Sequence, residues 1–319
     1  MYKRLKLISL GANKEMASNI AESIGAELLP TTVTHFADGE VLFESKKSFR
    51  GDNIYIIQST CPPVTENLME LLVCIDACKR ASAKSINCII PYFGYARQDR
   101  KAKPRQPITA KLVADMLEVA GANRVVCTDL HAAQLVGFFS IPVDDISPIP
   151  LFYKYLSSLN LEDVVCVSPD HGGVGRTTKL AEKFNAPLAI IDKRRPQPNK
   201  AEILSIVGDV KDKTCIIVDD IVDTAGTLVL AIEKLYELGA KRIFAVVSHG
   251  VLSNDAIAKI DGSHLEKLII TDSIPLKEEK KSNKIEVVSL APLFSKIICA
   301  LEEGASLHEV HQKYVEENQ

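Results

Sequence analysis

Short apolar runs alternate with longer stretches of helical periodicity along almost the whole chain. The short runs are rich in β-branched residues, as buried strands are, and the longer stretches repeat apolar residues at intervals of three and four. This alternation predicts parallel sheets with helices on both faces. Helices are expected around residues 68–78, 112–120 and 228–235. After a first strand at the N-terminus, further strands are expected at residues 54–57, 86–90, 125–128, 164–167, 188–191, 215–218, 243–247, 268–271 and 285–289.

The length of the chain, 319 residues, favours two domains, because single hydrophobic cores stop growing at roughly 250–300 residues. The boundary is expected within residues 141–150, the stretch richest in proline. We therefore predict an α/β fold of two similar domains, each a mostly parallel sheet flanked by helices. They would span residues 1–145 and 146–319, with about the last 25 residues able to pack back on the N-terminal domain.

Composition restricts the partners and the compartment. The net charge is −3 and Lys and Arg form no block, so the sequence does not indicate a nucleic-acid partner. No apolar run approaches the roughly 20 residues of a membrane span, and the N-terminus lacks the features of a signal peptide. We therefore expect a cytoplasmic protein without a membrane partner. A polyanionic substrate would need local cations or a metal ion, because the overall charge is acidic.

Cysteine usage agrees with that compartment. Seven of the eight cysteines lie inside apolar segments, as small hydrophobic residues do. Cys74 and Cys78 share one helical face, but no second Cys or His pair follows at the spacing of a zinc site. The sequence therefore predicts buried free thiols.

The sharpest chemical signal is the stretch from Cys215 to Thr227. A buried strand brings two adjacent carboxylates, Asp219 and Asp220, to its carboxyl end, where paired acceptors can hold the vicinal hydroxyls of a ribose. A turn of small residues then opens a helix, and its hydroxyls and unpaired N–H groups form a cup suited to a phosphate monoester. The turn consists of Asp223, Thr224, Ala225, Gly226 and Thr227. The alternative is an acidic strand end followed by an ordinary helix N-cap.

This stretch resembles the signature of the type I phosphoribosyltransferase fold. Further segments stand in the order found in the ribose-phosphate pyrophosphokinase family, and the similarity extends over most of the chain. These segments are residues 36–40, 91–100, 129–131, 168–173 and 192–196. The resemblance implies transfer of the β,γ-diphosphoryl group of Mg-ATP to the C1 hydroxyl of ribose 5-phosphate, giving phosphoribosyl pyrophosphate and AMP.

The resemblance also assigns residues to each substrate. It implies that ATP is bound by Phe36, which stacks on adenine, and by Asp38, Gly39, Glu40, Arg97 and Gln98. An Arg offers a planar fork to phosphate and a Gln can read a base edge, although a solvated basic loop is the alternative for Arg97 and Gln98. Ribose 5-phosphate would be bound by Arg195, Asp219, Asp220, Asp223, Thr224, Ala225, Gly226 and Thr227.

Two polar residues that follow predicted strands are candidates for a metal site. His131 comes after the strand at residues 125–128, and Asp170 after the strand at residues 164–167. A lone His is more often a packed or hydrogen-bonded residue than a ligand. The resemblance implies instead that His131 and Asp170 contact Mg²⁺, which keeps most of its waters and needs few protein ligands.

The charged run at residues 192–196 follows a predicted strand and leads into a polar loop rich in proline. Such a run is usually a solvated surface. Facing a polyphosphate, however, it can neutralise the charge that develops during phosphoryl transfer. The resemblance implies that Lys193 is catalytic, and that Arg195 shares this role while it also holds ribose 5-phosphate. No side chain stands out as a general base.

The resemblance further implies a homo-oligomer, a hexamer built from dimers, with a nucleotide pocket that straddles two subunits. Members of the family are commonly activated by phosphate and inhibited by ADP. Ser48 and Arg50 match the part of the family pattern that is linked to this regulation. Residues 304–311 depart from the usual serine-containing stretch, and Ser140 stands where Asp is common.

Other functions fit the sequence less well. An ordinary P-loop kinase would need a lysine that residues 172–176 lack. A phosphoribosyltransferase would share residues 219–227, but it would not need a nucleotide segment at Arg97 and Gln98 or a second α/β domain. A non-catalytic regulatory subunit, or a sensor of phosphoribosyl pyrophosphate, would be indicated by loss of Lys193 or Arg195, and both residues are present.

Overall fold

The computed structural model describes residues 4–197 and 200–316, and it leaves the side chains of residues 193–204, 311–313, 315 and 316 outside the description. The chain divides into two compact units. Unit 1 comprises the chain up to Ser147, together with Ser273–Pro275 and the segment that begins at Ser289. Unit 2 comprises Pro148–Asp272 and Leu276–Val288.

Unit 1 is built on a six-stranded parallel sheet in the order β2-β1-β5-β6-β7-β8. Most of its buried positions are Val, Ile, Leu and Cys, which suit strands covered on both faces. The strands are β1 (Leu5–Ser9), β2 (Glu27–Leu28), β5 (Asn53–Ile57), β6 (Ser85–Ile90), β7 (Arg124–Thr128) and β8 (Val143–Ile146). A separate antiparallel hairpin is formed by β3 (Thr31–His35) and β4 (Val41–Ser45).

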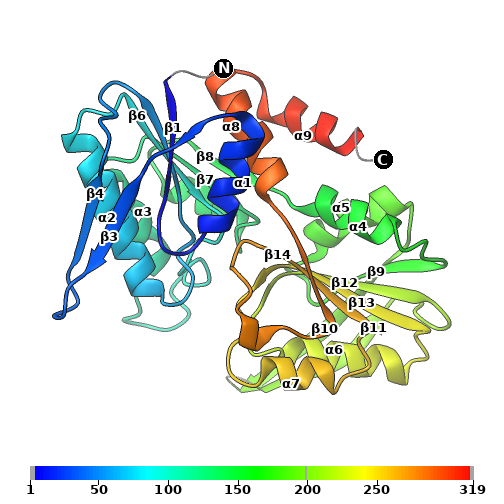
Figure 1. Cartoon of the computed structure of the whole chain (residues 1–319). Helices are drawn as coiled ribbons and strands as arrows, with labels where there is room; N and C mark the ends of the chain where they lie inside the picture. The colour runs from blue at the N-terminus through cyan, green and yellow to red at the C-terminus, as the bar shows by residue number, and fades with distance from the viewer. Residues whose placement is uncertain (1–3, 198–199, 317–319) are drawn as a thin grey trace. The chain divides into compact units, whose positions relative to one another are not determined.

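Helices from both ends of the chain cover the sheet of unit 1. Helices α2 (Val64–Arg80) and α3 (Thr109–Ala120) bury their apolar faces against one side, where Leu71, Ile75 and Val113 join the core. Helix α1 (Lys14–Ile24) packs against α8 (Ala291–Glu303), and α8 contacts α9 (Leu307–Glu316) (Figure 1). A short 3₁₀ helix, η1, spans Ala133–Phe138.

Helix α8 makes polar as well as apolar contacts within unit 1. The carboxylate of Glu302 accepts hydrogen bonds from Asn53 Nδ2 at 3.0 Å and from the Tyr55 hydroxyl at 2.9 Å, so the late helix is joined to β5. Burial and the adjacent carboxylate of Glu302 raise the pKa of Tyr55 far above its ordinary value. Unit 1 is therefore discontinuous in sequence, since its sheet comes from the first half of the chain and α8 from the last tenth.

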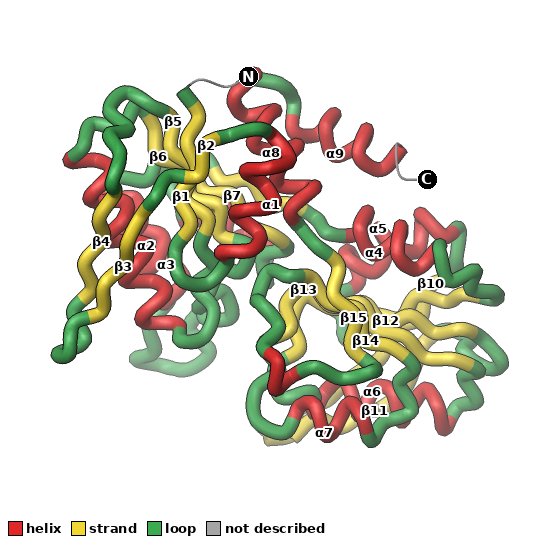
Figure 2. The backbone as a smooth tube through the Cα atoms, in the orientation of Figure 1, coloured by secondary structure: helices red, strands yellow, loops and turns green. Residues whose placement is uncertain are grey.

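Unit 2 is a seven-stranded sheet in the order β11-β10-β9-β12-β13-β14-β15, with every neighbouring pair parallel except β10 and β11. Figures 1 and 2 show helices on both of its faces. The strands are β9 (Val164–Ser168), β10 (Leu188–Gln197), β11 (Lys200–Val207), β12 (Thr214–Val222), β13 (Arg242–Gly250), β14 (Lys267–Thr271) and β15 (Ile285–Val288). The helices are α4 (Ile149–Ser157), α5 (Val174–Phe184), α6 (Gly226–Glu237) and α7 (Ala256–Asp261), with a 3₁₀ turn, η2, at Glu278–Lys280.

Alternation along β12 distributes its side chains between two cores. Ile216 and Val218 pack with residues of α4 and α5, whereas Cys215 and Ile217 pack with residues of α6. Even-numbered positions of this strand therefore face α5 as far as Val218, and this arrangement bears on the acidic pair that follows.

The prediction of mostly parallel sheets flanked by helices is confirmed, and each strand expected from the sequence is present. The proline-rich stretch at residues 141–150 contains β8, which pairs with β7, because Val143 to Ile146 are free of proline, and the two units divide just after it, between Ser147 and Pro148. One local expectation was wrong. The charged run at residues 192–196 is not a loop but the continuation of β10, whose backbone pairs with the unpredicted strand β11.

The expectations for cysteine hold in the structure. All eight cysteines are free; seven are buried and Cys299 is half-buried. Burial raises the pKa of Cys166 and of Cys215 to about 12, so these thiols stay protonated and unreactive at neutral pH. Within the part of the chain that the structure describes, no helix combines the length and the apolar character needed to cross a membrane.

Candidate active site

The acidic pair lies near the carboxyl end of β12. Asp220 is 6% exposed, and its Oδ1 lies 3.7 Å from Nη1 of Arg176 in the first turn of α5. Asp220 therefore continues the α5 face of the strand. Sequence reasoning noticed Arg176 only as the end of a glycine-rich run. The only sequence signal for a role of Arg176 was its position, a cationic side chain three residues after Gly173 at the beginning of a helix.

Asp219 is in a different electrostatic state from its neighbour. Its Oδ1 accepts the backbone N–H of Asp220 at 2.9 Å. Desolvation of the carboxyl group, followed by the negative charge of Asp220, raises the pKa of Asp219 well above its ordinary value. The protein thus holds two adjacent carboxyl groups, one paired with a guanidinium and one that resists ionisation. Hydroxyl donors or a cation would relieve that resistance.

Two backbone carbonyl groups in the turn after β12 accept hydrogen bonds. The Asp223 carbonyl accepts the Ser253 N–H at 2.8 Å, and the Thr224 carbonyl accepts Nζ of Lys259 at 3.3 Å. Ala225 has a left-handed backbone, with φ 59°, and α6 begins at Gly226. The N-cap residue, Ala225, makes no side-chain hydrogen bond to the first amides of α6. Amides at a helix N-terminus can bind an anion, and the phosphate cup that the sequence predicts here stays a prediction.

Asp170 belongs to a tight turn between β9 and α5. Its Oδ1 accepts the Gly173 N–H at 3.0 Å, and the Ser168 hydroxyl donates to its backbone carbonyl at 2.7 Å. Across this turn, His171 Nε2 lies 3.3 Å from Asp192 Oδ1 at the beginning of the charged run. The turn after β9 and the charged part of β10 therefore lie side by side within unit 2.

Lys193 and Arg195 lie in β10, where the backbone of Lys193 pairs with Ile203 and a register shift separates Asp192 from Lys193. Their side chains lie outside the described residues, so their roles stay predictions. The adjacent Asp192, however, is fixed by His171, and this contact places the beginning of the run next to the Asp170 turn.

In unit 1, the predicted nucleotide residues 36–40 form the turn of the β3–β4 hairpin. The Phe36 N–H donates to the Glu40 carbonyl and the Gly39 N–H to the Phe36 carbonyl, each at 2.9 Å. Asp38 Oδ1 accepts the Glu40 N–H at 3.1 Å, and Gly39 adopts a positive φ of 92°. The Phe36 ring is 47% exposed, so the turn presents an aromatic surface to solvent.

The segment with Arg97 and Gln98 follows β6 and is fixed to α3. The side chain of Gln98 accepts a hydrogen bond from the Thr109 hydroxyl at 2.6 Å, and its carbonyl accepts the Ala110 N–H at 3.2 Å. Arg97 and Gln98 are both exposed. The Gln98 amide oxygen therefore already has a partner, which leaves its amide nitrogen as the group able to contact a base.

Gly94 anchors the beginning of this segment. Its N–H donates to the Thr60 hydroxyl at 2.6 Å, and a Cβ at this position would lie 2.4 Å from the Thr60 backbone carbonyl. Such an approach requires glycine. Sequence reasoning missed the requirement because Thr60 lies 34 residues earlier in the chain.

We expect Gly94→Ala to lower the free energy of unfolding by about 2–4 kcal/mol, because the backbone at Thr60 must move to admit the methyl group. Chemical denaturation followed by circular dichroism would measure this loss. Gly137→Ala is the matched control, since a Cβ there meets no atom within 4 Å. Equal stability of the two variants would contradict the packing argument.

His131 is exposed and follows a turn that β8 holds in place. Asp129 has a positive φ of 45°, and its N–H donates to the Ile146 carbonyl at 3.1 Å. The Leu130 N–H donates to Asp145 Oδ1 at 3.0 Å. Asp145 thus fixes the backbone immediately before His131. Within the described residues, three or more His, Cys, Asp or Glu side chains do not gather into a metal-binding group.

Comparisons with known proteins agree with these features. Residues 5–121 match the N-terminal domain of ribose phosphate pyrophosphokinase, and residues 176–312 match the phosphoribosyl synthetase-associated domain. The chain is 54% identical to a ribose-phosphate pyrophosphokinase of Oceanobacillus iheyensis over 95% of its length and 96% of that protein's. It belongs to the ribose-phosphate pyrophosphokinase family.

Other members of the family extend the comparison. The chain is 52% identical to the ribose-phosphate pyrophosphokinase of Bacillus subtilis, over 96% of each protein. The crystal structure of phosphoribosylpyrophosphate synthetase from Mycobacterium smegmatis superposes with a TM-score of 0.88 at 39% identity, covering 95% of this chain and all of that one. The resemblance inferred from the sequence motifs is therefore confirmed over nearly the whole length, and both matched domains contain predicted site residues.

Proposed function

We propose that this member of the family transfers the β,γ-diphosphoryl group of ATP to the C1 hydroxyl of ribose 5-phosphate, giving phosphoribosyl pyrophosphate and AMP. The observation that carries the proposal is the 54% identity over 95% of the chain to a protein named for this activity. The geometry of unit 2 supports it, since a carboxylate pair and a helix N-terminus stand at successive positions of one strand–turn–helix segment.

Unit 2 would bind ribose 5-phosphate. The amides of Gly226 and Thr227 at the beginning of α6, with the hydroxyls of Thr224 and Thr227, offer donors to the 5-phosphate. Asp219 and Asp220 would accept hydrogen bonds from the ribose hydroxyls. Because Asp220 is held by Arg176, it is already oriented before the sugar arrives. Binding would then order few side chains, which favours affinity.

Unit 1 would supply the ATP residues. The exposed ring of Phe36 suits stacking on adenine, and the turn that contains Asp38, Gly39 and Glu40 is held by its own backbone hydrogen bonds. Arg97 offers a guanidinium to phosphate and Gln98 an amide nitrogen to the base edge. We further propose a homohexamer in which the nucleotide pocket is completed by a second subunit.

Mg²⁺ is the metal ion that a triphosphate substrate implies, and the residues fit it. Asp170 uses Oδ1 to hold the Gly173 amide, while its other carboxylate oxygen has no partner within the described part of the chain. His131 is exposed on a turn fixed by Asp145. We propose Asp170 and His131 as ligands; two protein ligands suffice for Mg²⁺, which keeps several waters. When bound, the ion would neutralise charge on the polyphosphate.

We propose that Lys193 and Arg195 stabilise the charge that develops on the transferred group. The contact between His171 and Asp192 brings the beginning of their charged run beside the Asp170 turn, which supports this placement. Catalysis would rest on positioning and on electrostatic stabilisation, which are the main contributions in phosphoryl transfer. Neither contribution requires a general base.

The test is a product assay with purified protein, MgCl₂, ATP and ribose 5-phosphate, in which AMP and ADP are separated by chromatography. We expect one AMP for each phosphoribosyl pyrophosphate formed, and loss of activity when EDTA removes the metal ion. Formation of ADP would show that a single phosphoryl group is transferred. Absence of both products, with ligand binding intact, would favour a non-catalytic subunit.

A further inference from the structure

A buried carboxylate lies in unit 1 outside the residues assigned so far. Glu70 is on the buried face of α2, between Leu68 and Leu71, and its side chain is 6% exposed. A carboxylate in such a place is costly unless hydrogen-bond donors surround it. The segments that supply its donors therefore indicate what the carboxylate holds together.

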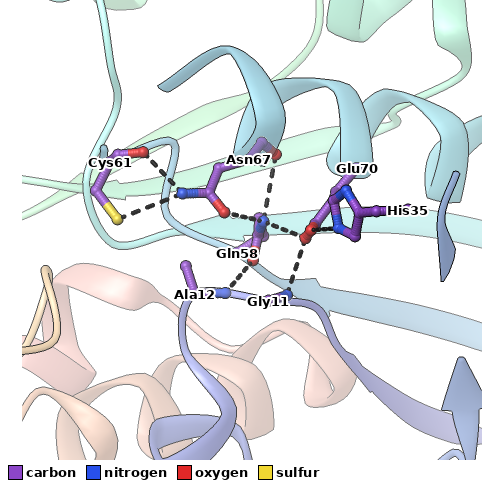
Figure 3. Close-up of polar contacts among 7 residues, drawn as sticks. All are labelled: Gly11, Ala12, His35, Gln58, Cys61, Asn67 and Glu70. Carbon is purple, nitrogen blue, oxygen red and sulfur yellow. Dashed lines mark hydrogen bonds and ion pairs between the residues drawn. The ribbon is translucent and has the colours of Figure 1, made fainter. Parts of the chain in front are cut away.

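Glu70 receives donors from three separate segments, as Figure 3 shows. The Gly11 N–H, just after β1, donates to Oε2 at 2.9 Å, and Gln58 Nε2, just after β5, donates to the same oxygen at 3.0 Å. His35 Nε2, at the end of β3, lies 2.9 Å from Oε1. One side chain thus links the loop after β1, the loop after β5 and the hairpin.

The backbone around Glu70 is shaped to fit it. A Cβ on Gly11 would lie 2.8 Å from Oε2, so any other residue here would have to displace the Glu70 carboxylate from its present position. Gln58 continues the network, because its Oε1 accepts the Ala12 N–H at 3.0 Å and its Nε2 lies 3.1 Å from Asn67 Oδ1 (Figure 3). The Gly11 amide and the Gln58 side chain, which follow two strands of the six-stranded sheet, therefore hold Glu70 in place.

The contact with His35 matters because of how the hairpin is attached. Strands β3 and β4 form their own two-stranded sheet, separate from the six-stranded sheet. Phe43 packs in the core and holds β4, but Phe36 is exposed beyond it. His35 pairs with Val41 at the last register position before the turn. The pair of His35 and Glu70 therefore anchors the hairpin at the end that carries residues 36–40.

We propose that Glu70, acting through His35, positions the turn of residues 36–40 for binding the nucleotide. The inference rests on the proposed function, since it assumes that this turn contacts ATP. Glu70 and His35 are positioning residues: neither touches the reacting groups. Removing the anchor lets the turn sample more orientations, and nucleotide binding must then order it again.

The principal test uses His35→Ala, which leaves the buried part of the network in place because the His35 side chain is 43% exposed. We expect its KM for ATP to rise about tenfold, with kcat and the KM for ribose 5-phosphate changed less than about twofold. His35→Gln retains a donor for Glu70 and should restore most of the affinity. An unchanged KM for ATP, or an equal rise for both substrates, would overturn the proposal.

A matched control exists in unit 2. His264 Nδ1 lies 2.7 Å from Glu233 Oε2, and the His264 side chain is 44% exposed, so its imidazole is as accessible as that of His35, while its carboxylate partner is 37% exposed where Glu70 is 6% exposed. His264→Ala should leave both KM values unchanged. A tenfold rise in its KM for ATP would show that loss of any such pair acts on the enzyme, and would contradict a specific role for His35.

Binding without turnover separates this inference from the proposed function. Calorimetry with α,β-methylene-ATP, whose α–β linkage cannot be cleaved, should show about tenfold weaker binding to His35→Ala than to the unaltered chain. If the unaltered chain binds the analogue but forms no AMP from ATP and ribose 5-phosphate, the proposed function fails, and the comparison of affinities still decides the role of His35. Equal affinities of the two proteins for the analogue would overturn the positioning role of His35.

A fluorescent probe can report the motion of the hairpin directly. The chain contains no Trp, and Leu42 is 40% exposed in β4, so Leu42→Trp introduces a single reporter beside the turn. Adding His35→Ala should lower the fluorescence anisotropy of this Trp, while adding His264→Ala should not. Identical anisotropy with and without His35 would contradict an anchoring role.

Discussion

Replacing Lys193 with alanine is expected to lower kcat by about two to four orders of magnitude, while the affinity for ATP changes by less than about threefold. A cation that acts on charge developing during transfer contributes to the transition state and little to the ground state. Both kcat and kcat/KM should therefore fall by the same factor. Initial rates of AMP formation and calorimetric titration with α,β-methylene-ATP would separate the two quantities.

Two variants make this experiment specific. Lys193→Arg retains the positive charge and should recover part of the turnover, whereas Lys211→Ala, at an exposed lysine of the same unit, should have normal turnover. Near-normal turnover in a folded Lys193→Ala protein would remove this residue from the mechanism. A large loss in ATP affinity with normal kcat would instead indicate a ground-state contact.

Asp219→Asn is expected to change stability and substrate binding in opposite directions. The KM for ribose 5-phosphate should rise about 10- to 100-fold, because a charged acceptor for the sugar hydroxyls is lost. The free energy of unfolding at neutral pH should increase by about 1 kcal/mol, because an amide carries no charge to be desolvated beside Asp220. Steady-state kinetics and chemical denaturation would measure the two effects.

The pH dependence of unfolding, compared between the unaltered chain and Asp219→Asn, tests the sign of this stability change independently. The folded state keeps a proton on Asp219 above its ordinary pKa of 3.8, where the unfolded chain has released it. This group therefore lowers the free energy of unfolding as pH rises from the ordinary pKa towards the raised one. Asp219→Asn lacks that loss, so its advantage should grow with pH over this range and then stay constant.

Asp220→Asn is the matched control at the neighbouring position. It relieves the same repulsion, but it also removes the charge partner of Arg176, whose side chain is 15% exposed. We expect this variant to be less stable than the unaltered chain. If Asp219→Asn were also less stable, the interpretation of its raised pKa as a cost to folding would be wrong.

Most strands of the two large sheets could be predicted from the sequence because they are continuous apolar runs buried on both faces, whereas β2, β8 and β11 were not predicted. The hairpin could not, since only Phe43 in β4 is buried and none of the β3 residues is. Strand β8 lies among prolines and has one buried residue, Ile146. The weak apolar signal of these three strands reflects their real exposure.

The candidate site was predictable wherever it depends on neighbours in the sequence. The turn before α6 and the acidic pair are local, and the structure places both in one strand–turn–helix segment. Contacts between distant residues were not predictable. Gly11 meets Glu70 across 59 residues, and no local pattern marks either as a partner of the other. The nearest signal in the sequence for this contact was Glu70 itself, a charged residue within the apolar stripe of α2.

The discontinuity of unit 1 has a consequence for synthesis on the ribosome. The surfaces of α1 and β5 that receive α8 are translated early, but α8 begins only at Ala291. At roughly 5–20 residues per second, unit 2 is made during an interval of about 7–28 s in which those surfaces lack their covering helix. Unit 2, whose strands are contiguous apart from a short gap, can therefore finish folding before unit 1, although its first residue emerges later.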